Sequence, residues 1–289
     1  MREYVITTDN NSDLPENYYR EHDVGCMYLS YAMDGKNYTH ENFLPVHEFY
    51  DAMRHGSMPT TAQVNPENAR CVLEPYLKAG KDILHIAFSS GLSGTYNSVR
   101  IAAKELEDEY PQRKIIVIDS LSASLGQGML VYMAQQKKEQ GQDMEAVAEW
   151  VEKNKLHMVH LFTVDDLNHL YRGGRVSKTT AVVGSVLNIK PVLHVDNNGK
   201  LIPLGKVRGR KKSLLDLVKL MDDKIGSFHD TCDTVFISHG DCEEEAQYVA
   251  EKVREKYNVK TMIINQVGAV IGAHSGPGTM ALFFLGDER

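Results

Sequence analysis

The chain has 289 residues, of which 42% are hydrophobic and 25% charged, and its formal net charge is −7. These values are typical of a globular protein with one large or two medium-sized domains. The negative charge argues against a general nucleic-acid-binding protein, which carries a basic surface for phosphates. No apolar run approaches the roughly 20 residues of a membrane span. A strand-like run begins at Tyr4, so we also expect no signal peptide.

The cysteines and histidines give no sign of a metal centre or a disulfide framework. None of the four cysteines belongs to a Cys-x-x-Cys pair, so a reducing cytoplasm is the expected compartment. His157 and His160 are possible metal ligands, but three residues apart in a strand they point to opposite faces. We therefore expect no metal and no cofactor.

The first half of the chain alternates predicted strands and helices. The hydrophobic pattern predicts strands over 4–8, 25–33, 83–88 and 114–118, with a hairpin turn at Asp34-Gly35. Helices are predicted over 46–55, 66–79, 95–108 and 126–140, several of them bounded by Asn, Pro or Gly. This alternation predicts a largely parallel sheet with helices on both faces.

The second half of the chain predicts a different kind of sheet. After a helix over 144–155, strands are expected over 158–163, 191–195, 201–207, 234–238, 260–265 and 279–285. Helices are expected over 165–171, 179–187, 212–225 and 243–257. The hairpin around Asp196-Asn197-Asn198-Gly199 indicates a mixed sheet. We predict an α/β fold of two α/β domains, residues 1–155 and 156–289, that enclose a ligand cleft.

A Ser/Gly-rich turn between predicted strand 83–88 and the following helix is the strongest local signal for a site. It combines the hydroxyls of Ser89, Ser90, Ser93 and Thr95 with a helix N-terminus. Unpaired N–H groups and the helix dipole favour an anionic oxygen group there, although Ser and Gly also cap ordinary turns. Similar polar segments occur at 59–63, 119–124 and 272–278.

Three familiar catalytic or nucleotide-binding signatures are missing. No Gly-Lys-Ser/Thr follows a glycine-rich loop, and no Rossmann fingerprint follows a strand. Ser93 lacks the second glycine of a nucleophile elbow, because position 95 is Thr. A Ser93–His274 pair could still act as nucleophile and base, so a Ser-dependent acyl hydrolase stays as the alternative function.

A basic cluster lies at a predicted helix start, where cations oppose the helix dipole. It consists of Lys206, Arg208, Arg210, Lys211 and Lys212. This placement suggests a docking surface for an acidic or phosphorylated partner. The alternative interpretation is a solvated helix N-terminus.

Taken together, these motifs resemble the DegV family of bacterial fatty-acid-binding proteins, and the match runs nearly end to end. The matching segments are Ile6–Asp9 with Asp13-Leu14, Pro59–Gln63, Ser89–Tyr96, Asp119-Ser120, Leu170–Arg175, Lys190–Leu193 and His274–Gly278. The family commonly has Thr-Ser-Gln where this chain has Thr61, Ala62 and Gln63. That departure puts one supporting hydrogen bond in doubt.

The resemblance implies a lipid-binding carrier in fatty acid metabolism and lipid transport rather than an enzyme. Two α/β domains would enclose one long-chain fatty acid, with its carboxylate held by Thr61 and Ser93 and its tail in an apolar tunnel. A separate fatty acid kinase would phosphorylate the bound acid, and the carrier would hold the acyl phosphate. Contact with a membrane would be at most transient, to exchange lipid.

Three further residues complete the predicted head-group site. Gly94 belongs to the same turn as Ser93. His274 is expected near the head group, presented by its Gly-Pro-Gly loop, or else as a buried structural histidine. Arg172 precedes two glycines that permit a tight turn, and would lend positive potential to the site or serve as a surface ion-pair partner. For the kinase, we expect Arg208, Arg210, Lys211 and Lys212 to form the docking face.

Overall fold

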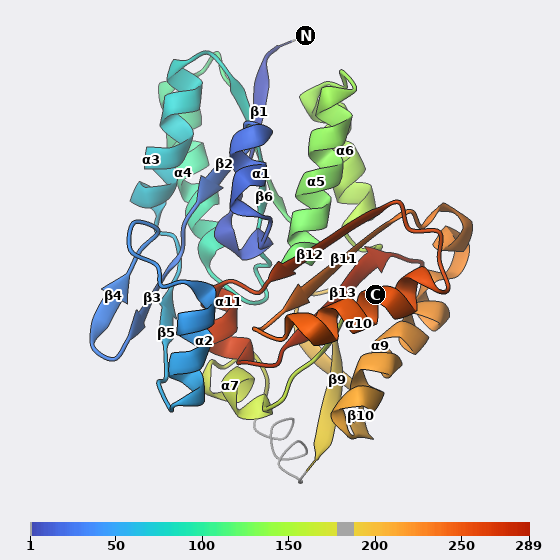
Figure 1. Cartoon of the computed structure of the whole chain (residues 1–289). Coiled ribbons are helices and arrows are strands. Elements are labelled where there is room, and N and C mark those ends of the chain that lie inside the picture. Colours follow the sequence, from blue (N-terminus) through green and yellow to red (C-terminus); the bar gives the residue numbers. More distant parts are fainter. Residues whose placement is uncertain (1, 178–187) are drawn as a thin grey trace.

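The computed structural model describes residues 2–177 and 188–289. Within them, the chain forms a parallel four-stranded sheet, a mixed six-stranded sheet and a small antiparallel sheet (Figure 1). The predicted α/β class, with a parallel sheet in the first half and a mixed sheet in the second, is confirmed. The helix predicted over 179–187 lies outside the described residues, and the division into 1–155 and 156–289 stays a prediction.

The four-stranded sheet has the order β2-β1-β6-β7, and all its neighbouring strands are parallel. Its strands are β1 (Tyr4–Asp9), β2 (Gly25–Met27), β6 (Asp82–Ala87) and β7 (Ile115–Asp119). Val5 and Ile83 belong to one hydrophobic cluster, whereas Ile6 and Leu84 belong to another. The sheet is therefore covered on both faces, which explains why β1 and β6 are buried throughout.

Helices from the first half of the chain cover these two faces. The Val5 face packs against α3 (Pro66–Lys78) and α4 (Thr95–Glu109). The Ile6 face packs against α1 (Glu16–Glu21), α5 (Leu125–Glu139) and α6 (Met144–Asn154). A short 3₁₀ turn, η1 (Asn10–Ser12), follows β1 directly.

The six-stranded sheet has the order β10-β9-β8-β13-β11-β12. Its strands are β8 (Met158–Thr163), β9 (Ile189–Val195), β10 (Leu201–Arg208), β11 (Thr234–His239), β12 (Thr261–Gln266) and β13 (Met280–Leu285). The β11–β12 pair is parallel and the other pairs are antiparallel. One face packs against α9 (Arg210–Ile225) and α10 (Glu243–Arg254), with η2 (Gly226–Thr231) following α9. The opposite face contacts α5, which also contacts β1 and β6, so α5 lies between the two large sheets.

The small sheet is the part of the fold that the sequence predicted least well. It consists of β3 (Ser30–Met33), β4 (Lys36–Tyr38) and β5 (Thr60–Ala62). The strand predicted over 25–33 is split, because the Asn10 side chain bonds both backbone groups of Leu29 in place of a neighbouring strand. The hairpin at Asp34-Gly35 is confirmed.

Three helices lie at or near the small sheet, and α11 brings a late part of the chain to it. They are α2 (Val46–Arg54), α7 (Leu167–Arg172) and α11 (Ala269–Ser275). Helix α11 contacts β3, β5, α2 and α7 (Figure 1). Residues near position 60 and residues near position 274 therefore meet in space.

Candidate functional site

A cavity of about 410 Å³ lies where residues just beyond β1, β6 and β7 face the six-stranded sheet. Most of its lining is apolar: Leu29, Phe88, Leu92, Phe162, Leu170, Val195, Leu201, Val267, Val270, Ile271, Ala281 and Phe283. The carboxyl ends of parallel strands are the usual place for a ligand in an open α/β sheet. The cavity thus matches the ligand cleft expected from the sequence.

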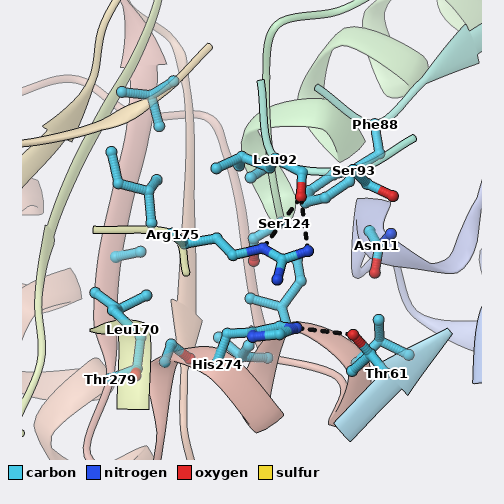
Figure 2. A pocket seen from close by; sticks show the side chains of 18 of the residues that line it. Asn11, Thr61, Phe88, Leu92, Ser93, Ser124, Leu170, Arg175, His274 and Thr279 are labelled. Carbon is cyan, nitrogen blue, oxygen red and sulfur yellow. Dashed lines mark hydrogen bonds between the residues drawn. The ribbon is translucent and has the colours of Figure 1, made fainter. Parts of the chain in front are cut away.

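Among the polar side chains that line this cavity are Thr61 and His274, which face each other (Figure 2). Thr61 Oγ1 lies 2.8 Å from His274 Nε2, although the two residues are 213 positions apart. Thr61 is on β5, whereas His274 is in the last turn of α11, just before the Gly-Pro-Gly loop. Burial, together with the nearby Arg175 cation, lowers the pKa of His274 to about 4, so its ring is neutral at physiological pH.

Arg175 provides the positive charge that faces the cavity (Figure 2). Its Nε and Nη2 donate to the Leu92 carbonyl at 3.1 and 2.9 Å, and its Nη1 donates to the Gly173 carbonyl. Burial lowers the pKa of this guanidinium. Gly174 has a φ of +73°, a left-handed conformation that glycine adopts without strain. This turn directs the chain after α7 so that Arg175 reaches Leu92.

Arg172 is placed differently from the prediction. It is exposed in the last turn of α7, its Nη2 lies 2.8 Å from His169 Nδ1, and it does not line the cavity. Both arginines flank the Gly173-Gly174 pair, and periodicity alone does not say which of them faces inward. The structure assigns that position to Arg175.

Ser93 lies in the turn before α4 and lines the cavity beside Gln63. Its hydroxyl is 3.0 Å from the Thr95 hydroxyl and accepts the Thr95 N–H at 3.2 Å. A Cβ at Gly94 would lie 2.3 Å from Gln63 Oε1, so glycine allows β5 and α4 to approach closely here. Gln63 Nε2 in turn donates to the Ser98 hydroxyl at 3.3 Å.

The contacts of His274 bear on the hydrolase alternative. Nucleophilic catalysis by Ser93 needs a base within hydrogen-bonding reach of its hydroxyl. In the structure, His274 is paired with Thr61, and the hydroxyl of Ser93 is paired with Thr95. The two residues line the same cavity without forming the required dyad.

The other polar turns mainly join parts of the fold. Ser89 Oγ donates to the Gly199 carbonyl at 2.8 Å, which ties the turn after β6 to the β9–β10 hairpin. Asp119 Oδ1 accepts the N–H groups of Ser90 and Leu121. These hydroxyl and carboxylate groups therefore act as turn caps, as the simpler interpretation of such segments holds.

Sequence reasoning missed a buried polar cluster centred on Asp13. Its carboxylate accepts hydrogen bonds from the Ser124 hydroxyl and the Gly268 N–H, and Ser124 is 2.8 Å from Ser238. Burial raises the pKa of Asp13 to about 7. The cluster joins loops from both halves of the chain. It lies beside the cavity, because Ser124 is one of the residues that line the cavity. The left-handed φ values of Asp13 and Ser124 are its local signature.

The structure also bears on metal sites and membrane spans. Across residues 2–177 and 188–289, no group of three or more His, Cys, Asp or Glu side chains is arranged to hold a metal ion. In the same ranges, no helix has the length and apolar character required to cross a bilayer.

A mostly apolar cavity with several polar side chains, set between α/β layers, is typical of small-molecule-binding α/β proteins. Residues 3–287 match the family model described as "Uncharacterised protein, DegV family". The chain belongs to the DegV family.

Relatives of known sequence and structure agree with this assignment. A DegV domain-containing protein of Clostridium perfringens is 45% identical over 100% of this chain and 99% of its own length. A DegV family protein from Thermus thermophilus, described as binding fatty acid, has a TM-score of 0.88 and 30% identity over 99% of this chain and 100% of its own. DegV from Bacillus subtilis, described as a fatty acid binding protein, has a TM-score of 0.85 and 28% identity with the same coverage.

Proposed function

We propose that this protein binds one long-chain fatty acid in the cavity, with its carboxylate at Thr61 and Ser93. The observation that carries the proposal is the lining itself, which is apolar over most of its extent and polar around these hydroxyls. The structural relatives described as fatty-acid-binding proteins support the same ligand class.

The energetics of such a ligand fit this lining. Each buried methylene contributes roughly 0.8 kcal/mol, and each hydrogen bond to a charged group roughly 1.5–3 kcal/mol. The tail therefore supplies most of the affinity, and the hydroxyls determine which end enters. Hydroxyl groups also leave carboxylate oxygens accessible to a phosphate donor.

In this proposal, His274 positions the Thr61 hydroxyl. With its Nε2 protonated, the neutral ring donates to Thr61 Oγ1 and leaves the Thr61 proton to the carboxylate. Arg175 takes the role of positive neighbour that the sequence suggested for Arg172. Gly94 contributes its backbone N–H at the start of α4, where the helix dipole favours an anion.

The binding site is tested by removing both hydroxyls, Thr61→Ala with Ser93→Ala. At the energies given above, this double variant should lose about 3–6 kcal/mol of fatty-acid binding free energy in a titration with delipidated protein. Ser57→Ala is the matched control, because the Ser57 hydroxyl bonds the exposed Asp34. Unchanged affinity in the double variant would refute the assignment of the carboxylate site.

We further propose that the protein is a carrier. It presents the bound acid to a separate fatty acid kinase and then holds the acyl phosphate that the kinase forms. The exposed members of the basic cluster, Lys206, Arg208, Lys211 and Lys212, are the docking residues we propose. Arg210 differs from them, because its Nε donates to Glu245 at 2.9 Å and its side chain is only 18% exposed. Arg210 is therefore not one of the docking residues that we propose.

Charge reversal of Arg208→Glu with Lys212→Glu tests the docking face. Rim charges mainly set association rate and salt dependence, so phosphorylation by the kinase should slow and lose salt sensitivity while fatty-acid binding stays intact. Reversal of the exposed Lys36 and Lys104 makes the same charge change elsewhere. If both double variants are phosphorylated alike, the cluster is only a solvated helix start.

A carrier and a hydrolase are distinguished by the fate of the ligand. Native mass spectrometry should detect an unchanged long-chain acid bound to the purified protein. Release of free acid from added acyl esters, abolished by Ser93→Ala, would instead support the hydrolase.

The four cysteines are all free thiols, which supports our proposal of a cytoplasmic location.

A further inference from the structure

Arg289 has a buried guanidinium whose donors are all satisfied by groups other than carboxylates. Nε donates to the Met158 carbonyl at 3.1 Å, and Nη1 donates to Leu121 and Asp196 carbonyls at 2.7 and 3.0 Å. Nη2 donates to the Ser122 hydroxyl and the Lys155 carbonyl, both at 2.8 Å, with the Ser120 carbonyl at 3.5 Å. The residue is 6% exposed. A charged group is rarely buried this deeply without a structural or functional reason.

These contacts join three segments that are distant in sequence. Leu121 and Ser122 belong to the turn between β7 and α5, and Asp196 to the β9–β10 hairpin. Lys155 follows α6, and Met158 begins β8. The turn at Leu121 has a left-handed φ of 50°, a conformation that costs free energy for a non-glycine residue. The Arg289 side chain is therefore the common partner that holds the three segments together.

The same segments form one wall of the ligand cavity. Ala123, His160 and Val195 each lie within two residues of an Arg289 contact, and all three line the cavity. His160 links them further, because its Nδ1 bonds the Met158 carbonyl while its Nε2 accepts the Ala123 N–H at 3.2 Å. Burial is the main cause that lowers the pKa of His160 well below its usual value. The ring is therefore neutral, and its Nε2 can accept the hydrogen bond from the Ala123 N–H.

Strand register separates His160, in this wall, from Thr279, whose hydroxyl donates to the Gly276 carbonyl two residues after His274. Thr163 pairs with Met280, next to the lining residue Thr279, whereas His160 pairs with Phe283. Three residues of strand separate the two layers, or roughly 10 Å at about 3.3 Å per residue. A ligand whose head group lies at Thr61 and His274 would reach the His160 layer only with the end of its chain.

We propose that Arg289 is a positioning residue for ligand binding, which holds the wall of Ala123, His160 and Val195 against the end of a long alkyl chain. This inference rests on the proposed fatty-acid function. Loss of the guanidinium leaves several buried carbonyls unpaired, so the β7–α5 turn separates from the hairpin and the distal cavity opens to water. Long chains then lose contacts that short chains never make.

The test compares chain lengths in one competition. Wild type and Arg289→Ala are delipidated and mixed with equimolar octanoic and octadecanoic acids, and bound acids are counted by native mass spectrometry. The ratio of bound octadecanoic to octanoic acid should fall about tenfold or more in the variant. Ser122→Ala removes a single hydrogen-bond acceptor of Arg289 and should lower the same ratio by a smaller factor. This variant replaces Arg289→Ala in the test if Arg289→Ala does not fold.

A control separates this role from general destabilisation. Asp222→Asn perturbs the Tyr257–Asp222–Lys256 contacts on the α9–α10 side of the sheet, and should leave the ratio at its wild-type value. An unchanged ratio in both Arg289→Ala and Ser122→Ala, or an equal fall in Asp222→Asn, would overturn the proposal.

Hydrogen exchange gives a second readout that needs no ligand. Amides of residues 121–126 should exchange faster in Arg289→Ala than in wild type, while those of α10 stay unchanged. Unaltered exchange in this turn would also overturn the proposal. If wild type binds neither acid, the proposed function itself fails. The comparison of exchange rates between wild type and Arg289→Ala still decides whether Arg289 holds the wall.

Discussion

Two ionisable side chains, the buried Asp13 and the partly buried His274, have pKa values that desolvation moves in opposite directions. The pKa of Asp13 is raised to about 7 and that of His274 is lowered to about 4. In each case desolvation favours the uncharged form. Both residues lie at or beside the cavity, so their protonation states affect its polarity.

Asp13→Asn should change the pH dependence of stability in a defined direction. Because the folded-state pKa of Asp13 is above its unfolded value, its contribution is greatest at low pH and is lost as pH rises from about 4 to about 7. Asparagine can still accept from Gly268 and bond Ser124. Urea unfolding between about pH 5 and pH 8 should therefore show wild type losing stability relative to Asp13→Asn as pH rises. A difference that is constant over this range would contradict the raised pKa.

His274→Gln tests whether the histidine acts as a neutral hydrogen-bond donor. With a pKa of about 4, His274 has no charge to lose between about pH 6 and pH 8. The ratio of wild-type to variant fatty-acid affinity should therefore be flat over that range. If the wild-type advantage falls as pH passes about 6.5, the histidine binds the carboxylate as a cation instead.

At the scale of secondary-structure elements, the site depends on how closely α7 and α11 approach each other. A Cβ at Gly173 would lie 2.1 Å from His274 Nδ1, so the end of α7 packs directly on the imidazole. The backbone at Gly173, with φ −72° and ψ −8°, suits any residue. Glycine is required here by contact and not by conformation.

Gly173→Ala should therefore displace His274 and weaken fatty-acid binding by about 1–3 kcal/mol, the usual cost of overpacking. Gly174→Asn is the matched control, because position 174 is open and asparagine tolerates its left-handed φ of +73°. Titration of both variants with the same acid makes the comparison. Equal affinities for the two would show that the α7–α11 contact does not control the site.

At the scale of the whole molecule, the cavity lies between two sheets that share helix α5. A ligand there would contact the loops that follow β1, β6 and β7 as well as the six-stranded sheet, surfaces that the unfolded chain does not bring together. Binding therefore stabilises the fold as a unit, by about 2.7 kcal/mol at a free ligand concentration of 100 times Kd.

Calorimetry should show this linkage as a rise in Tm of several degrees when octadecanoic acid is added to delipidated protein. The Thr61→Ala, Ser93→Ala double variant should show a smaller rise at the same concentration, because its Kd is larger. A Tm that the acid leaves unchanged in wild type would contradict specific binding in the folded state.

The sequence by itself determined those features that depend on neighbours along the chain. Short apolar runs predicted β1 and β6, Asn65 and Pro66 predicted the start of α3, and Asp34-Gly35 predicted the hairpin, because apolar runs, helix caps and turn conformation are local properties. The hydroxyl-rich turn at Ser93 was visible for the same reason. The resemblance added Thr61 as its partner, and the structure brings both residues to one cavity.

Only the tertiary structure decided which of several equivalent residues face the cavity. Arg172 and Arg175 flank the same two glycines, and the left-handed turn at Gly174 makes Arg175 the one that reaches Leu92. Arg210 is not among the proposed docking residues, because its side chain is hydrogen-bonded to Glu245 on another helix. The Thr61–His274 pair and the contacts of Arg289 join residues that are far apart in sequence. Such contacts depend on strand order, register and helix packing, which no local pattern encodes.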